Sequence, residues 1–169
     1  MRLLITAGII AALFSIVHSA GYRINTTRSL PVGVYQTVSD APKHSDLASF
    51  CLSPENEYRE LAEERNYLGS SSLCPSGQKP LLKKFAGAAG DIIILHPDGI
   101  QVNSERHALT IRTHDSSGRP LPHKLRAGII PTGKALMLST YNPNSFDGRY
   151  FGLVDEKNLH KVIPVFTFN

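Results

Sequence analysis

One serine in the chain stands in a setting that suits a nucleophile. Ser29 is followed by Pro31 and Gly33. Proline fixes one backbone dihedral and glycine tolerates unusual ones, so this spacing predicts a tight turn that presents the hydroxyl and backbone N–H of Ser29 outward. Such a hydroxyl can attack a carbonyl if a base removes its proton. Most strings of this kind are ordinary turns, so the segment alone leaves both interpretations open.

A base is offered by two lysines, Lys83 and Lys84, embedded in an apolar run that begins at residue 81. Successive side chains of a strand point to opposite faces, so one of the two amines can point inward. The pKa of a free lysine is about 10.4, and burial among apolar groups lowers it toward the range of about 7–8 that a base needs at neutral pH. The alternative is that both lysines are solvated residues of an edge strand.

A polar loop at residues 142–152 supplies side chains that can support such a pair. Ser145 can orient a lysine amine. Asp147 and Arg149 stand two residues apart and can pair on one face, which would fix the loop. The alternative is a solvated surface loop with an exposed ion pair of little energetic weight.

Short apolar runs, each bounded by Gly, Pro, Asn or Asp, predict the antiparallel sheets that must bring these side chains together. The predicted strands are residues 33–38, 47–52, 91–95, 100–103, 108–113, 135–140 and 162–166. Between two of them, His96-Pro97-Asp98-Gly99 predicts the turn of a hairpin. Residues 116–120 predict a second loop. We therefore expect a mainly β fold.

Two cysteines flank the one helix that the sequence predicts. Ser53 and Pro54 are typical of an N-cap and a first helical position, and an apolar face follows as far as residues 68–69. Cys51 and Cys74 match no zinc or redox motif, and an exported domain meets conditions in which two thiols persist as a disulfide. We expect this disulfide to staple the base of the helix; two unpaired buried thiols are the alternative.

The first twenty residues predict a membrane anchor or a secretory signal. After Arg2, residues 3–20 are almost wholly apolar and near the minimum length that spans a bilayer. The small pair Ser19-Ala20 also fits a cleavable signal, and a buried core helix is a third interpretation. We favour an uncleaved anchor at residues 1–20. Arg2 would then lie on the cytoplasmic side and residues 21–169 across the inner membrane, in the periplasm.

The composition suits one folded domain at residues 21–169 and argues against several classes of function. The formal charge is +4, but Lys and Arg are spread along the chain without a basic block, so no nucleic-acid partner is expected. None of the seven histidines falls at the His-x-x-x-His spacing of a zinc helix. We expect no metal and no cofactor.

Taken in order, the three polar segments resemble the sequence boxes of the Ser/Lys signal peptidase family, and most of all its TraF type, the conjugative-transfer peptidases. Residues 29–35 resemble the nucleophile box, residues 82–91 the lysine box, and residues 144–152 the last conserved loop. General signal peptidases place the proline three residues after the nucleophile, whereas Pro31 stands two after Ser29. This departure favours the TraF type.

The resemblance implies the roles of the reacting groups. Ser29 would be the nucleophile and Lys83, the first of the paired basic residues, its base. The backbone N–H of Ser29 and the hydroxyl of Thr27 would stabilise the oxyanion. The fold implied is a signal-peptidase-like antiparallel coiled β-sheet with one short inserted helix and an N-terminal membrane anchor.

The resemblance also implies a supporting shell. Ser145 would hydrogen-bond the lysine, while Asp147, counted with the catalytic residues, would brace the site together with Arg149. The acidic residues that general signal peptidases carry just before this loop are replaced at residues 140–142 by Thr, Tyr and Asn. Any role of those acids therefore does not transfer to this chain.

By the same resemblance, the substrate would be an exported pilin precursor and the partners the membrane and the conjugation or secretion machinery. The sequence does not decide whether water or an amine, as in head-to-tail joining, resolves the acyl-enzyme. Other functions stay open. They are a noncatalytic exported β module that scaffolds pilus or secretion machinery, a Ser-His-Asp triad using Ser29, and a soluble self-cleaving Ser/Lys repressor. The apolar N-terminus disfavours the repressor.

Overall fold

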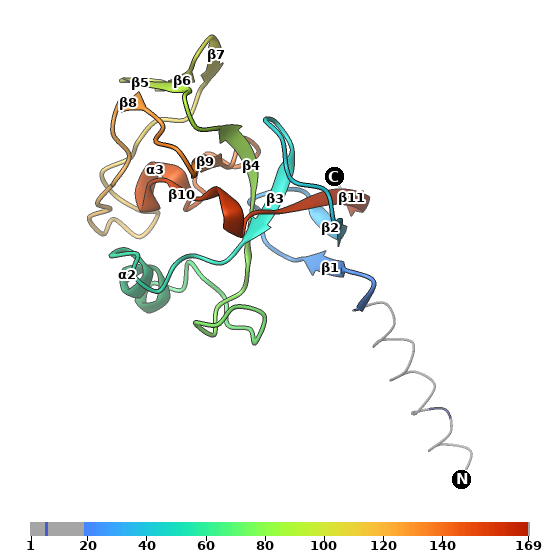
Figure 1. Ribbon diagram of the computed structural model, residues 1–169. Helices are drawn as coiled ribbons and strands as arrows, with labels where there is room; N and C mark the ends of the chain where they lie inside the picture. Colours follow the sequence, from blue (N-terminus) through green and yellow to red (C-terminus); the bar gives the residue numbers. More distant parts are fainter. Residues whose placement is uncertain (1–5, 7–18, 169) are drawn as a thin grey trace.

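The computed structural model describes residue 6 and residues 19–168, and its regular elements are almost all strands (Figure 1). The strands are β1 (Tyr22–Asn25), β2 (Val32–Thr37), β3 (Leu47–Phe50), β4 (Leu81–Gly87), β5 (Ile92–His96), β6 (Gly99–Val102), β7 (Glu105–His107), β8 (Gly128–Ile129), β9 (Lys134–Leu138), β10 (Val154–Asp155) and β11 (His160–Phe168). The short helices are α2 (Arg59–Glu64), α3 (Gly148–Phe151) and η1 (Glu156–Asn158). The expected mainly β fold is confirmed.

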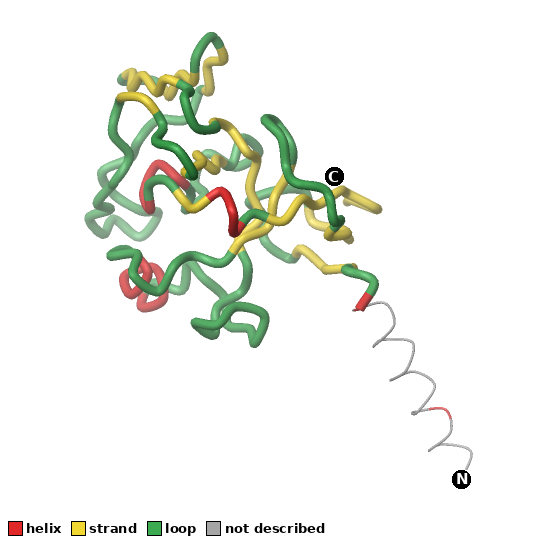
Figure 2. The backbone as a smooth tube through the Cα atoms, viewed as in Figure 1, coloured by secondary structure: helices red, strands yellow, loops and turns green. Residues whose placement is uncertain are grey.

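The strands form two antiparallel sheets. The larger sheet has seven strands in the order β1-β2-β11-β3-β4-β9-β10, and the smaller has four in the order β7-β6-β5-β8. Figure 2 shows the twisted larger sheet crossing the molecule, with long loops around it and the small sheet at one end. The C-terminal strand β11 pairs with both β2 and β3, so the end of the chain completes the sheet between its early strands.

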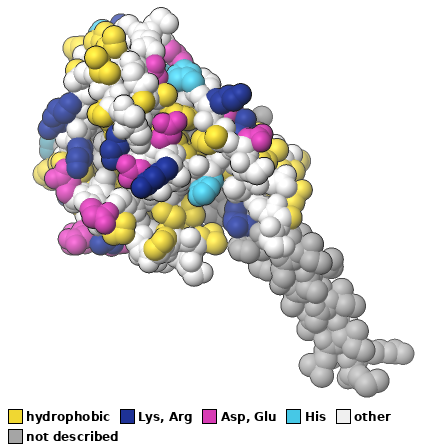
Figure 3. Space-filling model, in the orientation of Figure 1, with side chains coloured by type: hydrophobic (Ala, Val, Ile, Leu, Met, Phe, Trp, Pro, Cys, Tyr) yellow, Lys and Arg dark blue, Asp and Glu magenta, His cyan; other side chains and the backbone are white. Residues whose placement is uncertain are grey.

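The core lies on both sides of strands β4 and β9. Phe50, Phe85 and Met137 pack with the loop that carries α3, whereas Ile100 and Leu136 pack under the smaller sheet. On the face of the molecule in Figure 3, charged side chains of both signs are interspersed.

The predicted hairpin and most predicted strands are confirmed within one or two residues. In the hairpin, His96 pairs with Gly99, so the turn contains Pro97 and Asp98. The apolar run that contains the two lysines is β4, at the middle of the larger sheet and not at an edge.

The strand predicted at residues 108–113 is wrong. Strand β7 ends at His107, and the following residues form no ladder. Leu109 is buried in the core, but the backbone beside it bonds to side chains: Thr110 O accepts from Arg149, and Arg112 N donates toward the Tyr150 hydroxyl. Leu109 packs in the part of the core under the smaller sheet, so the pattern reflects burial without strand pairing.

The helix between the cysteines is shorter than predicted. It covers only Arg59–Glu64, and Ser53 is not its N-cap. Residues 53–58 form successive turns instead, and the Asn56 side chain donates to Phe151 O at 2.9 Å. Asn66 takes a left-handed conformation with φ of 57° just after the helix, which ends it before residues 68–69.

The predicted anchor at residues 1–20 lies almost wholly outside the described residues. No helix among the residues that the structure describes is long and apolar enough to span a bilayer.

Candidate active site

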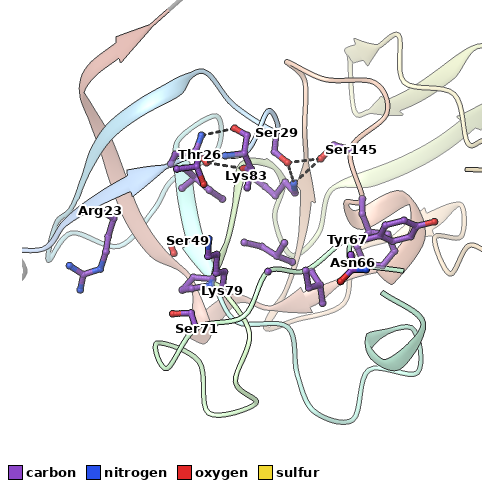
Figure 4. Close-up of a pocket in the computed structure, with 18 of the residues that line it drawn as sticks. Arg23, Thr26, Ser29, Ser49, Asn66, Tyr67, Ser71, Lys79, Lys83 and Ser145 are labelled. Atoms are coloured by element: carbon purple, nitrogen blue, oxygen red, sulfur yellow. Dashed lines mark hydrogen bonds between the residues drawn. The ribbon is translucent and has the colours of Figure 1, made fainter. Parts of the chain in front are cut away.

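A cleft of about 890 Å³ opens beside the larger sheet and contains the predicted nucleophile and base. Strands β1, β2 and β4 supply much of its lining, and loops around Tyr67, His114 and Phe146 also contribute. Figure 4 shows Ser29, Lys83 and Ser145 converging at one end of the cleft, while Asn66 and Tyr67 lie across from them. The cleft has room for an extended polypeptide segment.

Ser29 lies in the turn between β1 and β2, as its sequence context predicts. The Asn25 side chain shapes this turn, because its Nδ2 donates to Pro31 O at 3.0 Å and to Thr27 O at 3.1 Å. Gly33 has a different role from the one its spacing suggested. A Cβ there would come within 2.1 Å of Phe166 O, so glycine allows β11 to approach the strand that leaves the turn.

Lys83 points from β4 to the nucleophile, and its side chain is buried. Its Nζ lies 2.7 Å from Ser29 Oγ and 2.8 Å from Ser145 Oγ, and the two hydroxyl oxygens are 2.9 Å apart. Lys84 points the other way and pairs with Glu105 at 3.0 Å. The alternation of the strand thus separates a buried amine from a partly exposed one.

Burial lowers the pKa of Lys83 to about 8. Loss of hydration is the main cause, because it disfavours the ammonium form. The negative charge of Asp147 opposes the shift, and the positive charge of Arg149 adds to it. A substantial neutral fraction of the amine therefore exists near physiological pH.

Asp147 and Arg149 form a fully buried ion pair, not an exposed one. Arg149 Nε donates to Oδ1 of Asp147 at 2.8 Å and Nη2 to Oδ2 at 3.0 Å. Asp147 also caps α3 by accepting from the backbone N–H of Arg149. Two further N–H groups of Arg149 bond to Ser145 O at 3.0 Å and Thr110 O at 2.9 Å. The pair therefore fixes the loop that carries Ser145.

Thr27, expected to stabilise the oxyanion, lies beside the nucleophile turn, but its hydroxyl is engaged elsewhere. Thr27 Oγ1 donates to Oδ1 of Asn25 at 2.8 Å, and Thr27 N donates to the same oxygen at 3.1 Å. A hydroxyl has one hydrogen to donate. The backbone N–H of Ser29 is therefore the simpler candidate donor.

Two polar residues of this region were missed by sequence reasoning. Asn25 is buried at the end of β1, and Ser139 is fully buried just after β9. Ser139 Oγ donates to Ser29 O at 2.6 Å, and Ser139 N donates to Asp147 at 2.9 Å. A polar residue at a strand end carries no distinctive signal in a single sequence.

A disulfide joins Cys51 to Cys74, with their Cα atoms 5.6 Å apart. It links the end of β3 to the loop that forms the far wall of the cleft. On that wall the Tyr67 hydroxyl donates to Asp115, and this bond, with those from Arg119, lowers the pKa of the Asp115 carboxyl. The disulfide and the Tyr67–Asp115 hydrogen bond therefore both fix this wall.

The arrangement provides the parts of an acyl-transfer site. Lys83 supplies a base with a lowered pKa, and Ser29 supplies a hydroxyl within hydrogen-bonding reach of it. Within the described part of the chain, no three His, Cys, Asp or Glu side chains are grouped to hold a metal ion.

Comparison with known proteins gives concordant matches. The family model described as "Signal peptidase, peptidase S26" matches residues 1–166. A plasmid transfer protein TraF of Escherichia coli is 34% identical over 168 residues, covering 97% of this chain and 93% of that protein. A probable conjugal transfer protein TraF of Sinorhizobium fredii is 37% identical over 139 residues, covering 78% and 69%. A crystal structure of a signal peptidase I from Enterococcus faecalis V583 is 18% identical, covers 73% of this chain and 97% of its own, and superposes with a TM-score of 0.41.

Proposed function

Because the chain belongs to the S26 signal peptidase family, we propose that it is a serine endopeptidase that matures an exported pilin precursor for conjugative transfer. The resemblance inferred from the three motifs is confirmed at the level of the family and of its TraF type. The names of the relatives, plasmid and conjugal transfer proteins, support a role in conjugation.

The observation that carries the proposal is the contact between Lys83 Nζ and Ser29 Oγ at 2.7 Å, made by a lysine that is 1% exposed. A charged lysine cannot accept a proton, and burial is the main factor that favours its neutral form here. A neutral amine at this distance is placed to take the proton of the hydroxyl.

The proposed reaction has two steps, acylation of Ser29 and release of the acyl group, and Lys83 transfers the proton in both. Neutral Lys83 takes the proton of Ser29 while the Ser29 oxygen bonds to the substrate carbonyl carbon. The resulting lysine ammonium gives this proton to the leaving amine as the peptide C–N bond breaks, which leaves an ester on Ser29. Water or a second amine then loses a proton to Lys83 as it bonds to the ester carbon, and Lys83 returns this proton to Ser29 Oγ as the ester C–O bond breaks.

The oxyanion of each step would be stabilised by the backbone N–H of Ser29, with Thr27 as a second donor if its hydroxyl turns from Asn25. Each such donor contributes up to about 3–4 kcal/mol in serine proteases. Ser145 would orient the Lys83 amine, and the Asp147–Arg149 pair would hold Ser145 in place.

The proposal places residues 1–20 in the inner membrane as an anchor and residues 21–169 in the periplasm as the peptidase domain. The Cys51–Cys74 disulfide supports an oxidising compartment. An acyl-enzyme attacked by the substrate's own amino terminus would give a head-to-tail joined product, whereas water would give a trimmed linear one.

The test is to co-express the full chain with a conjugative pilin precursor and to measure the intact mass of the pilin. We expect a processed product, either linear and trimmed or smaller by one further water if joined head to tail. Ser29→Ala and Lys83→Ala should leave the precursor uncut. Lys84→Ala is the matched control, because it removes the neighbouring amine that pairs with Glu105, and it should process normally.

A noncatalytic scaffold makes a different prediction for the same experiment. The precursor would keep its mass with the wild-type chain, or the Ser29→Ala chain would process it as well as the wild type does. Either result would remove the peptidase proposal.

A further inference from the structure

A buried serine outside the three motifs lies behind the nucleophile. Ser139 follows β9 and is 0% exposed. Its hydroxyl donates to the backbone carbonyl of Ser29 at 2.6 Å, and its backbone N–H donates to Oδ2 of Asp147 at 2.9 Å. Ser139 therefore connects the main chain of the nucleophile to the buried ion pair.

The hydrogen bond from Ser139 fixes the turn that carries Ser29 to a segment that is distant in the sequence. Asn25 bonds to three other carbonyls of the turn, but Asn25 belongs to the adjoining strand β1 and so shapes the turn locally. Ser139 follows β9, which pairs with β4, the strand that carries Lys83. A hydrogen bond to the Ser29 carbonyl fixes the orientation of the peptide group between Ser29 and Leu30. It therefore fixes the position of Ser29 relative to β4, the strand that carries Lys83.

The same ion pair fixes the second hydroxyl that contacts the amine. Arg149 donates to the backbone carbonyl of Ser145 at 3.0 Å, while Asp147 holds Ser139. Both hydroxyls around the lysine amine are thus positioned, through their main chains, by one rigid buried pair.

We propose that Ser139 is a positioning residue for acylation: its hydroxyl holds the Ser29 peptide so that Ser29 Oγ stays aligned with Lys83 Nζ. The proposal rests on the peptidase function proposed above. Misplacement of a reacting group by about 1 Å can lower a rate about 100-fold. Ser139 contacts the carbonyl and not the amine, so its loss changes the rate of acylation but neither the pKa of the base nor the binding of substrate.

The test measures acylation of the full chain by the p-nitrophenyl ester of N-acetyl-alanyl-alanine, which releases a burst of p-nitrophenol. For Ser139→Ala we expect the burst rate constant to fall about 10- to 100-fold. We expect the half-saturating ester concentration to stay within about twofold, and the pH midpoint of the rate to stay unchanged. Ser139→Cys leaves no cavity but donates weakly, so its rate constant should fall as well even if alanine destabilises the fold.

The matched control is Ser76→Ala. Ser76 Oγ is also buried, and it has no hydrogen-bond partner in the described part of the chain, so this variant should keep the wild-type rate constant. A purely structural role for Ser139 predicts a smaller burst amplitude with an unchanged rate constant. That result, or a wild-type rate constant in both Ser139 variants, would overturn the proposal.

The wild-type chain and Ser29→Ala separate this inference from the proposed function. A wild-type burst that Ser29→Ala lacks supports the enzyme, and the Ser139 variants then test the positioning role alone. Absence of a wild-type burst removes the enzyme and the inference together.

Discussion

Lys83 is an ionisable residue that is buried almost completely. Its side chain is 1% exposed, and burial lowers its pKa to about 8. The neighbouring Asp147 carboxylate acts in the opposite direction, which keeps the pKa within the physiological range. At pH 7 a pKa of about 8 leaves roughly a tenth of the amine neutral, which is compatible with the proposed role as a base.

The pH dependence of acylation follows from this pKa. Only neutral Lys83 accepts the Ser29 proton, so the burst rate with the p-nitrophenyl ester should rise nearly tenfold per pH unit below about pH 8 and level off above it. Subtracting the Ser29→Ala rate removes spontaneous ester hydrolysis. A rate that stays constant from about pH 6 to 9 would rule out a lysine base.

Replacement of Lys83 by methionine should stabilise the fold while abolishing activity. A lysine whose pKa is lower in the folded state than in the unfolded state penalises folding at every pH below about 8, and the penalty disappears as the pH rises toward the free-lysine value of about 10.4. We expect the free energy of unfolding at pH 7 to increase by about 1–3 kcal/mol in urea unfolding, with a smaller gain above pH 10.

The control is Lys84→Met, because Lys84 is the neighbouring lysine of the same strand and pairs with Glu105 at the protein surface. Equal changes in the two variants, or a gain for Lys83→Met that is as large above pH 10 as at pH 7, would contradict a lowered lysine pKa.

At the scale of elements, the sequence predicts features that depend on neighbouring residues. It does not predict contacts between segments that are far apart in the chain. The inward direction of one lysine follows from strand alternation, and the hairpin at His96–Gly99 follows from its turn residues. The spacing of Asp147 and Arg149 predicts that they pair, but not that the pair is buried. In the fold the pair bonds to Thr110 and Ser139, whose proximity to it the sequence does not indicate.

The elements that the sequence mispredicted failed for the same reason. Residues 108–113 alternate like a strand, yet their backbone bonds to α3 side chains instead of a neighbouring strand. Ser53 and Pro54 look like a helix start, yet the Asn56 side chain is held by Phe151 and the helix begins later. In both places a contact with a segment far along the chain outweighs the local preference.

The buried Asp147–Arg149 pair should make the stability of the fold sensitive to the loss of either partner. Arg149→Met removes the ion-pair partner of Asp147, which is 0% exposed, so we expect the free energy of unfolding to fall by about 3–5 kcal/mol. The matched control is Arg106→Met, because both side chains of the Arg106–Asp98 pair are exposed. This variant should change the free energy of unfolding by less than about 1 kcal/mol. Urea unfolding that gave both variants similar small losses would contradict a structural role for the buried pair.

At the scale of the molecule, the site depends on nearly the whole chain. The turn with the proposed nucleophile precedes β2, the proposed base lies on β4, and the loop that carries Ser145 follows β9. Strand β11, the last in the chain, lies between β2 and β3 and so joins the nucleophile side of the sheet to the side of the base. The match of the family model to residues 1–166 covers every one of these segments but the very end of β11.

The most direct measurement is to locate the covalent acyl group. The wild-type chain, treated with the p-nitrophenyl ester, quenched in acid and digested, should carry the acetyl-alanyl-alanyl mass on the peptide that contains Ser29. Lys83→Ala should lack this adduct, and Lys84→Ala should form it as the wild type does. An adduct on another residue, or equal labelling of Ser29 in the Lys83→Ala chain, would contradict a nucleophile activated by the buried amine.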